Sequence, residues 1–162
     1  MYIRHTQIED IPRLLEIYEE ARTFMAQHGN PTQWTKGYPS EALLTHDIQQ
    51  NNSYVCIENN RIVGTFAFII GEDPTYTVIE KGGWHATKEY GTIHRSVSDG
   101  TTKNLTKCIF DYCTAQQDYI RIDTHQDNRP MQLALKRYGF TPCGIIHVAD
   151  GSPRIAFDYI KK

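Results

Sequence analysis

The sequence predicts a single α/β domain, residues 1–162, in which about four helices flank a mixed, mostly antiparallel sheet of six to seven strands. Two pairs of segments rich in β-forming residues, at 54–70 and 143–159, each contain a tight-turn signal and indicate antiparallel hairpins. Between them, a strand, a turn, a helix and a buried strand over 91–123 indicate a parallel crossover. Apolar residues at helical intervals elsewhere predict the covering helices.

The amino-terminal third contains a short strand followed by two helices. Residues 2–4 are predicted to be the first strand, and Thr6 and Glu9 have the spacing of a capping box before an amphipathic helix. Gly29-Asn30-Pro31 ends that helix, and an aromatic, turn-rich loop follows. A second, short helical pattern covers residues 41–49. We expect the loop between the two helices to contact substrate.

The first hairpin turns at Asn59-Asn60, because Asn tolerates the positive φ of a tight turn. Residues 71–90 carry scattered aromatic and turn-forming residues and predict a long excursion, within which Tyr76–Ile79 is a candidate strand. The elements after this excursion are strand 91–97, a helix from about 105 to 113, strand 119–123, helix 130–138, and strands 143–148 and 154–159. Gly139 suits the end of the last helix, and Asp150-Gly151 suits the final turn.

Composition excludes several classes of function. The 17 Lys and Arg residues are outnumbered by 19 Asp and Glu residues, so no global positive field exists to attract nucleic acid. The four cysteines include no pair at the two-residue separation of zinc knuckles, and the histidines lack metal-ligand spacing, so we expect no metal. We find no secretory signal and no apolar run near the roughly 20 residues of a membrane span, and therefore expect a cytoplasmic protein with reduced thiols.

The turn after strand 91–97 is a candidate anion site. Residues 98–106 are mostly small or hydroxyl-bearing, and Lys103 supplies a cation. A strand that leads through a short turn into a helix presents unpaired N–H groups and the positive end of the helix dipole to a ligand such as a pyrophosphate. The alternative is an ordinary capped turn.

Asn128 lies just beyond the end of strand 119–123, where open α/β sheets place their ligands. Its side chain could therefore hydrogen-bond a ligand. Equally, it could cap the helix that begins near Pro130, a role that Asn fills well.

In this order, the pieces resemble the GNAT superfamily of acetyl-coenzyme A dependent N-acetyltransferases over essentially the whole chain. Residues 93–98 resemble its fourth strand, and Asn128 with Gly139-Phe140 eleven residues later resembles its closing motif. Residues 30–34, Gly83-Trp84 and residues 150–154 are more similar to a bacterial branch of uncharacterised members. The resemblance implies a sheet that splays between its fourth and fifth strands and binds acetyl-coenzyme A there.

The resemblance also implies a reaction and a set of cofactor contacts. An acetyl group would pass to a primary amine by direct attack, with a strand N–H polarising the thioester carbonyl and no acyl-enzyme. The implied cofactor contacts, which include the pantetheine-binding part of the fourth strand, are Ser96, Val97, Ser98, Lys103, Asn104, Leu105, Thr106 and Asn128.

The sequence departs from the family's pyrophosphate pattern, which is Arg or Gln, two residues, Gly, one residue, and Gly or Ala. Thr101, Asn104 and Thr106 stand at the matching positions. We expect backbone N–H groups to bind all the same, with Lys103 offsetting the lost charge, because these positions open a helix rather than demanding positive φ.

A base near neutral pKa would help the amine lose its proton. His94, on the strand that borders the acetyl group in the family, is the candidate, unless it is an ordinary core residue. Glu80 and Glu89 are the runners-up, and each could equally be a solvated loop charge.

The general acid is not identified. Leu135 occupies the position at which many family members have a Tyr, and its place on an apolar stripe predicts core packing. Tyr90, Tyr76 or a water molecule could supply the proton instead.

Four aromatic residues in the two long loops could wall an acceptor site and hold a cationic amine against a ring face. These are Trp34, Tyr38, Tyr76 and Trp84. Equally, they could pack the loops down.

Two other functions remain open from the sequence. One is a non-catalytic acyl-coenzyme A sensor with a decayed site, and the other is an α/β protein that works through dimer or partner contacts. The acceptor, a small-molecule amine or a peptide, is not identified, and a homodimer is compatible with the fold.

Overall fold

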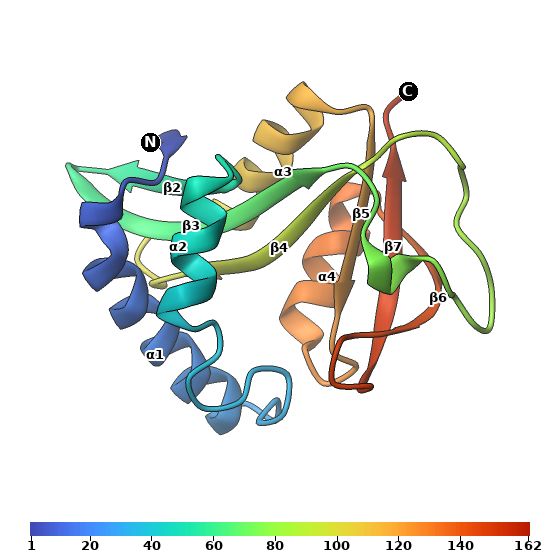
Figure 1. Ribbon diagram of the computed structural model, residues 1–162, viewed down its shortest axis with the longest axis horizontal. Helices are drawn as coiled ribbons and strands as arrows, with labels where there is room; N and C mark the ends of the chain where they lie inside the picture. Colours follow the sequence, from blue (N-terminus) through green and yellow to red (C-terminus); the bar gives the residue numbers. More distant parts are fainter. The chain divides into compact units, whose positions relative to one another are not determined.

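The computed structural model describes residues 1–162. Seven strands form one mixed sheet in the order β1-β2-β3-β4-β5-β7-β6, with four α-helices (Figure 1), which confirms the predicted fold class. The strands are β1 (Tyr2–His5), β2 (Ser53–Glu58), β3 (Arg61–Ile70), β4 (Gly91–Ser98), β5 (Tyr119–Thr124), β6 (Thr141–His147) and β7 (Pro153–Ile160). The α-helices are α1 (Ile11–Gln27), α2 (Glu41–Gln49), α3 (Leu105–Gln116) and α4 (Arg129–Tyr138).

The strand pairings confirm both hairpins and the crossover. Strands β2 and β3 are antiparallel, as are β6 and β7, and β1 adds to β2 in the antiparallel sense. Asn59 and Asn60 turn the first hairpin with φ of 51° and 62°, the left-handed conformation expected of them. Strands β4 and β5 are parallel, with Gly91 opposite Ile120 and Thr92 opposite Arg121.

Backbone contacts divide the chain into two compact units, each with its own core. Unit 1 comprises Met1–Phe68 and His94–Ile109, and unit 2 comprises Ile69–Ile93 and Phe110–Lys162. No helix in either unit combines the length and the apolar character that crossing a membrane requires.

The core of unit 1 lies between α1, α2 and the face of β2 that carries Val55 and Ile57. Because side chains alternate along a strand, Cys56 points to the opposite face, where it is also fully buried. The buried residues of this core are Leu14, Ile17, Tyr18, Leu44, Val55, Ile57 and Val97. The apolar stripe predicted for the first helix therefore faces the sheet.

The start of α1 differs from the predicted capping box. A single 3₁₀ turn, Ile8–Asp10, precedes the helix, and the N–H of Gln7 donates to Asp10 Oδ2 at 2.7 Å. The prediction of Thr6 and Glu9 was wrong by one residue, because Thr6 is buried and its hydroxyl accepts a hydrogen bond from Ser53. Arg4 also binds both oxygens of Asp10, at 2.8 and 3.1 Å.

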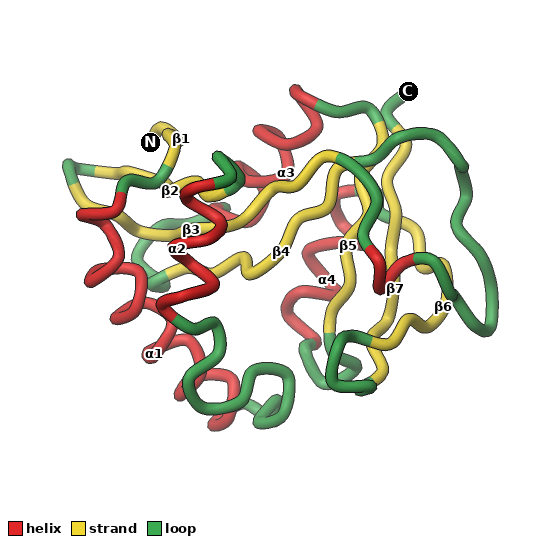
Figure 2. Tube along the Cα trace, in the orientation of Figure 1, coloured by secondary structure: helices red, strands yellow, loops and turns green.

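Unit 2 contains the long excursion between β3 and β4. Figure 2 shows it as a loop with one short helical turn, Pro74–Tyr76, so the candidate strand at Tyr76–Ile79 was wrong. Within it, Glu80 forms an isolated bridge to Ile145 of β6. Pro74 at the start of the turn and Asp73, which caps it through the N–H of Thr75, explain why this stretch is helical.

Helix α4 ends as predicted. Gly139 adopts φ 116° and its N–H donates to the carbonyl of Leu135 at 3.2 Å. The chain then turns directly into β6, and Phe140 packs against Phe110, Tyr138 and Tyr159. This aromatic cluster fixes the carboxyl-terminal end of α4.

Candidate functional site

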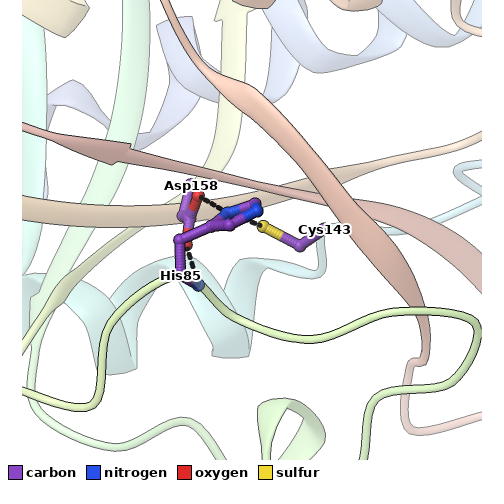
Figure 3. Close-up of side chains that lie close together, drawn as sticks. All are labelled: His85, Cys143 and Asp158. Carbon is purple, nitrogen blue, oxygen red and sulfur yellow. Dashed lines mark hydrogen bonds and ion pairs between the residues drawn. The ribbon is translucent and has the colours of Figure 1, made fainter.

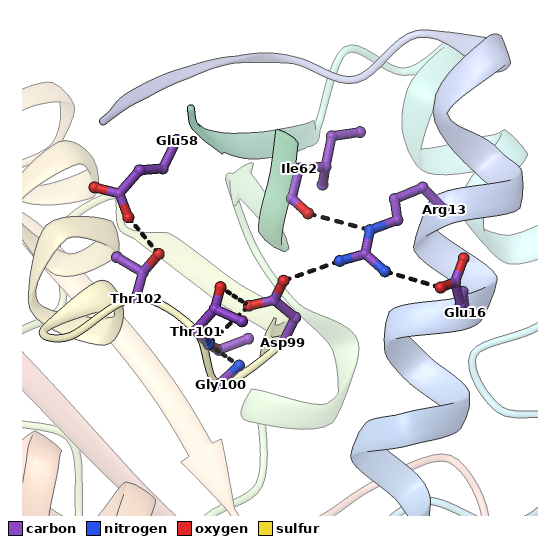
Figure 4. A network of polar contacts seen from close by, with 9 residues as sticks. Arg13, Glu16, Glu58, Ile62, Asp99, Gly100, Thr101 and Thr102 are labelled. Atoms are coloured by element: carbon purple, nitrogen blue, oxygen red, sulfur yellow. Dashed lines mark hydrogen bonds and ion pairs between the residues drawn. The ribbon is translucent and has the colours of Figure 1, made fainter. Parts of the chain in front are cut away.

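The turn between β4 and α3, residues 99–104, is held together by its own side chains (Figure 4). Asp99 Oδ1 accepts from the N–H of Thr101 at 2.9 Å and from its hydroxyl at 2.6 Å. The N–H of Gly100 donates to Ser98 Oγ at 3.0 Å. The N–H groups of Gly100 and Thr101 therefore already donate to side chains of the same segment. A ligand would have to use other N–H groups, such as those at the start of the helix.

Helix α3 begins with a left-handed residue. Asn104 has φ 61°, and its carbonyl accepts the helical hydrogen bond from Cys108. The expectation that no position here demands positive φ was wrong, because Asn104 lies in the left-handed region. Asn is the non-glycine residue that tolerates this conformation best. Leu105 and Thr106, which follow it, form the first turn of the helix, where N–H groups lack intrahelical partners.

Gly64 of β3 lets α3 approach the sheet. A Cβ at this position would lie 2.4 Å from Leu105 Cδ2 and 2.8 Å from the carbonyl oxygen of Val97. Leu105 is 3% exposed, so the first residue of the helix packs directly over the glycine. This contact sets the position of the helix amino terminus relative to β3 and β4.

The charges around the turn are mixed. Asp99 Oδ2 accepts from Arg13 Nη2 at 2.9 Å, and this partly buried pair neutralises the aspartate (Figure 4). Glu58 Oε2 accepts from the hydroxyl of Thr102 at 2.6 Å and adds a second carboxylate. Lys103 is exposed and supplies a cation on the turn. An anion predicted at this turn would therefore depend more on helix N–H groups than on net charge.

Strand β4 runs through a residue with a strained, left-handed backbone near its centre, and we call this local distortion the bulge. Arg95 has φ 53°, a conformation that costs a non-glycine residue about 1–3 kcal/mol. Its carbonyl accepts from the hydroxyl of Tyr18 at 2.6 Å, and its guanidinium binds both oxygens of Asp47 at 2.8 and 2.9 Å. Burial raises the pKa of Tyr18, so the hydroxyl stays protonated and donates. We call Tyr18, Asp47 and Arg95 the β4 clamp.

Two residues of the clamp, Arg95 and Asp47, are charged and mostly buried. The side chains of Arg95 and Asp47 are 11% and 5% exposed. Burial lowers the pKa of Arg95, but the Asp47 carboxylate and the nearby Tyr38 outweigh it and keep the pKa above its ordinary value. The guanidinium therefore stays charged, and the strained backbone is fixed from two sides.

The predicted residues of β4 lie around this bulge. His94 and Ser96 flank Arg95 and are half-buried. Val97 is buried in the unit 1 core, so only its backbone can contact a ligand. Ser98 is half-buried and binds the N–H of Gly100, as described above. The roles of these residues toward substrate or cofactor remain predictions.

Two of the predicted acceptor-site aromatics lie in unit 1 and pack on the clamp. Trp34 meets Tyr18 edge to face with ring centroids 5.5 Å apart, and lies 6.4 Å from Tyr38. Arg22 Nη1 donates to the carbonyl of Tyr38 at 2.7 Å and fastens the loop to α1. The loop between α1 and α2 therefore contacts the residues that hold the bulge.

The other two aromatics lie in unit 2 and have partners from within the chain. Tyr76 is 1% exposed, and its hydroxyl donates to Asp123 Oδ2 at 2.6 Å. Trp84 donates to the carbonyl of Tyr76 at 3.0 Å, and the guanidinium of Arg121 lies 4.2 Å from the Trp84 ring centre. An internal cation thus occupies the kind of position that the sequence analysis proposed for an acceptor amine. Acceptor binding by these two rings remains a prediction.

The candidate acids and bases of unit 2 are of two kinds. Glu80 and Glu89 are exposed. Tyr90 is 5% exposed, its oxygen accepts from the N–H of Asp73 at 2.7 Å, and its ring stacks on Arg121 at 4.0 Å. Tyr90 is therefore held by contacts with the loop and with Arg121, whereas Glu80 and Glu89 are exposed charges of the loop.

Asn128 caps α4. Its side-chain oxygen accepts from the N–H of Met131 at 3.3 Å, so the capping role foreseen as an alternative is present. Leu135 is fully buried, as its apolar stripe predicts. Tyr138 is fastened by hydrogen bonds to Asp111 and Thr114. A contact between Asn128 and a ligand remains a prediction.

Sequence reasoning missed the β4 clamp. The pairs in it are 48 and 77 residues apart, so no local spacing reveals them. The one available signal is a charged Arg in the middle of a predicted strand, flanked by residues that the family uses for its cofactor.

Among known proteins, the matches to this chain are solved structures. No protein-family model and no curated protein matches the sequence. Among solved structures, a GNAT family acetyltransferase from Streptococcus agalactiae is 29% identical, covers 99% of this chain and 95% of its own, and superposes with a TM-score of 0.90. A GNAT family acetyltransferase from Listeria monocytogenes is 15% identical over 98% and 94% of the two chains, with a TM-score of 0.71. The GNAT-like decarboxylase GphF, solved with isobutyryl-coenzyme A, is 14% identical over 99% of each chain, with a TM-score of 0.67.

Proposed function

Because the chain belongs to the GNAT superfamily and its neighbours support acyl transfer, we propose that it transfers an acetyl group from acetyl-coenzyme A to a primary amine. The observation that carries the proposal is the conformation of Asn104. The family has Gly at this position, and Asn104 here adopts a left-handed backbone, φ 61°, which Gly adopts without steric cost. This glycine-like conformation directly before the helix supports an anion site at its amino terminus, although the sequence pattern is lost.

The cofactor's pyrophosphate would bind at the first turn of α3. The N–H groups of Leu105 and Thr106 and the positive end of the helix dipole favour an anion there. Thr101, where the family has Arg or Gln, is bonded to Asp99 and supplies no charge. Lys103 is the exposed cation on this turn. We therefore expect coenzyme A to bind with a weaker dependence on salt than a site built from several cations would show.

The thioester would lie against β4. Strain at Arg95 turns the strand backbone locally, and a bulge of this kind can aim an N–H at a carbonyl oxygen that becomes negative during attack. His94, half-buried next to the bulge, is the proposed base that takes the proton of the amine. The β4 clamp would hold both groups in place.

The cysteines support direct attack rather than an acyl-enzyme. A nucleophilic Cys needs a lowered pKa and an accessible thiol. Burial raises the pKa of Cys56 to about 12, and burial and Asp158 raise the pKa of Cys143 above its ordinary value. Cys113 is fully buried. These thiols are poor nucleophiles, so attack by the free amine is the simpler route.

A non-catalytic acyl-coenzyme A binding protein is the second candidate. Two observations favour it: the carboxylate of Glu58 on the turn, and the buried Leu135 where many family members have a Tyr acid. It shares the binding step with the first proposal and lacks the chemical step.

A turnover assay distinguishes the acetyltransferase from the non-catalytic binding protein. Purified protein is incubated with acetyl-coenzyme A and a panel of primary amines that includes polyamines, amino sugars and peptide amino termini, and the released free thiol is measured. We expect amine-dependent thiol release, with kcat lowered in His94→Gln. Binding of acetyl-coenzyme A without thiol release for any amine class would favour the non-catalytic protein.

A further inference from the structure

Unit 2 brings together three side chains that are far apart in the sequence. His85 lies in the loop between β3 and β4, Cys143 in β6 and Asp158 in β7 (Figure 3). His85 Nδ1 is 2.7 Å from Asp158 Oδ1 and 3.4 Å from Cys143 Sγ. One ligand atom from each residue lies within 4.8 Å of the other two. We call these residues the His-Cys-Asp cluster.

The cluster does not have the geometry of a nucleophilic triad. In such a triad, the acid and the nucleophile bind opposite nitrogens of the imidazole. Here both lie on Nδ1, as Figure 3 shows, and the pKa of Cys143 is raised by burial and by the neighbouring Asp158. Three groups that converge on a common point are instead typical of a metal site.

From this convergence we propose that the His-Cys-Asp cluster binds a divalent cation of the zinc class. For metal bonds of about 2.0 Å to nitrogen and 2.3 Å to sulfur, two tetrahedral ligands lie about 3.5 Å apart. The observed separation of Nδ1 and Sγ, 3.4 Å, matches this value. The separation of Nδ1 and Oδ1, 2.7 Å, must open by about 0.6 Å, because the metal replaces a hydrogen bond.

The side chains can make this adjustment. The His85 side chain is 45% exposed and can move outward, whereas that of Asp158 is 2% exposed. Because His85 is partly exposed, a cation could enter beside it and keep a fourth coordination position for water. Cys143 is 5% exposed and lies on the inner side of the cluster. A three-ligand site with one open position results.

Asp158 is already oriented as a ligand. Its Oδ2 accepts from the hydroxyl of Tyr119 at 2.8 Å and from the N–H of His85 at 2.8 Å, which leaves Oδ1 facing the cluster. Arg121 Nε in turn donates to the Tyr119 oxygen at 3.2 Å. Hydrogen bonds behind a ligand carboxylate fix its direction and commonly raise metal affinity. Burial raises the pKa of Asp158, but these hydrogen bonds outweigh it and lower the pKa overall, so the carboxylate is ionised.

Close backbone packing between the loop and β6 places His85 next to Cys143. The N–H of Gly83 donates to the carbonyl of Cys143 at 2.9 Å. A Cβ on Gly82 would lie 2.0 Å from that same carbonyl oxygen, and one on Gly144 would lie 2.4 Å from the carbonyl of Glu80. The two glycines permit the loop and β6 to touch. The cluster is therefore a product of a fixed backbone, and a bound cation would fasten the loop further.

When the cation binds, both the protons released and the charges of the ligands can be accounted for. The thiol of Cys143 gives its proton to the buffer as the metal–sulfur bond forms, since a coordinated thiol is deprotonated. His85 binds through Nδ1 of its neutral ring and carries its proton on Nε2. One thiolate and one carboxylate then neutralise the two charges of the cation. The histidine and cysteine spacing led the sequence analysis to expect no metal, and the fold supplies the convergence that spacing could not reveal.

Cobalt(II) titration of the tag-free, full-length protein tests the proposal. We expect one equivalent of Co²⁺ to give the near-ultraviolet thiolate-to-cobalt band and the intense visible bands of a tetrahedral ion, and Zn²⁺ to displace it. Calorimetry in buffers of different ionisation enthalpy should show that Zn²⁺ binding releases a proton. The melting temperature should rise with added Zn²⁺.

Single-residue variants test whether the metal binds at the His-Cys-Asp cluster. Cys143→Ser should abolish the thiolate band, and His85→Gln should weaken binding by about tenfold or more. Tyr119→Phe, which removes the hydrogen bond behind Asp158, should weaken it by roughly tenfold. Cys108→Ser is the matched control and should leave the titration unchanged. His85 is exposed, so His85→Gln should fold whatever happens to the buried variants. No thiolate band at a hundred micromolar Co²⁺, or a band that survives Cys143→Ser, would overturn the proposal.

Discussion

The carboxylate of Asp47 holds the bulge of β4 through Arg95, so its removal should be costly. In Asp47→Ala, the guanidinium of Arg95, 11% exposed, loses both of its hydrogen bonds to Asp47. Breaking a buried pair by removing one partner costs about 3–5 kcal/mol. Because Tyr38 lies nearby and the guanidinium reaches some solvent, we place the loss near the lower end, at about 3 kcal/mol.

Urea unfolding measures this loss as a fall in the midpoint at constant slope. The matched control is Glu16→Ala, which removes from Arg13 a carboxylate that is 61% exposed and should cost less than about 0.5 kcal/mol. If the proposed function is right, Asp47→Ala should also lower kcat more than it weakens coenzyme A binding. A loss below about 1 kcal/mol, or one equal to that of Glu16→Ala, would refute the claim that the clamp holds a strained strand.

Three further changes test the packing, the turn and the ion pair at α1. Gly64→Ala should destabilise the protein by about 1–3 kcal/mol and displace α3, whereas Gly83→Ala, which has open space around its Cβ, should cost little in the same urea titration. Asn104→Gly should preserve stability and cofactor affinity. Asn104→Ala should lower the free energy of unfolding by about 1 kcal/mol, because this position has a left-handed φ that Ala disfavours. Burial raises the pKa of Asp10, but hydrogen bonds, chiefly from Arg4, lower it overall from 3.8, so its stabilisation is present above about pH 4 and lost as the pH falls further. Asp10→Asn should therefore flatten the acid limb of a pH–stability curve, and an unchanged limb would contradict this origin.

Much of the fold follows from local signals in the sequence. The Asn59-Asn60 turn, the glycine after α4 and the alternation along β2 and β3 each depend on residues close together in the chain. The errors arose where two local signals competed. Thr6 has the right chemistry for a cap, but its hydroxyl is used by Ser53 across the sheet. Tyr76–Ile79 has β-forming residues, but Pro74 starts a helical turn before them.

The sequence predicts where the candidate site lies, and the structure adds its geometry. The order of strand, turn and helix predicts an anion site at residues 98–106, which stays a prediction. The left-handed Asn104 could not be foreseen, because Asn is common in turns of every kind, with either sign of φ. The β4 clamp and the His-Cys-Asp cluster join segments that only the folded sheet brings together.

The most direct test of the account is whether the amino terminus of α3 binds the cofactor. Acetyl-coenzyme A is titrated calorimetrically into the wild type, Thr106→Glu and Ala115→Glu. Glu in the first turn of a helix favours folding through the dipole, so Thr106→Glu should fold well while repelling a phosphate, and Ala115→Glu places the same charge on an exposed position near the other end of α3. We predict micromolar binding to the wild type and Ala115→Glu, and at least about tenfold weaker binding to Thr106→Glu. No binding to the wild type, or equal binding to all three proteins, would contradict the account.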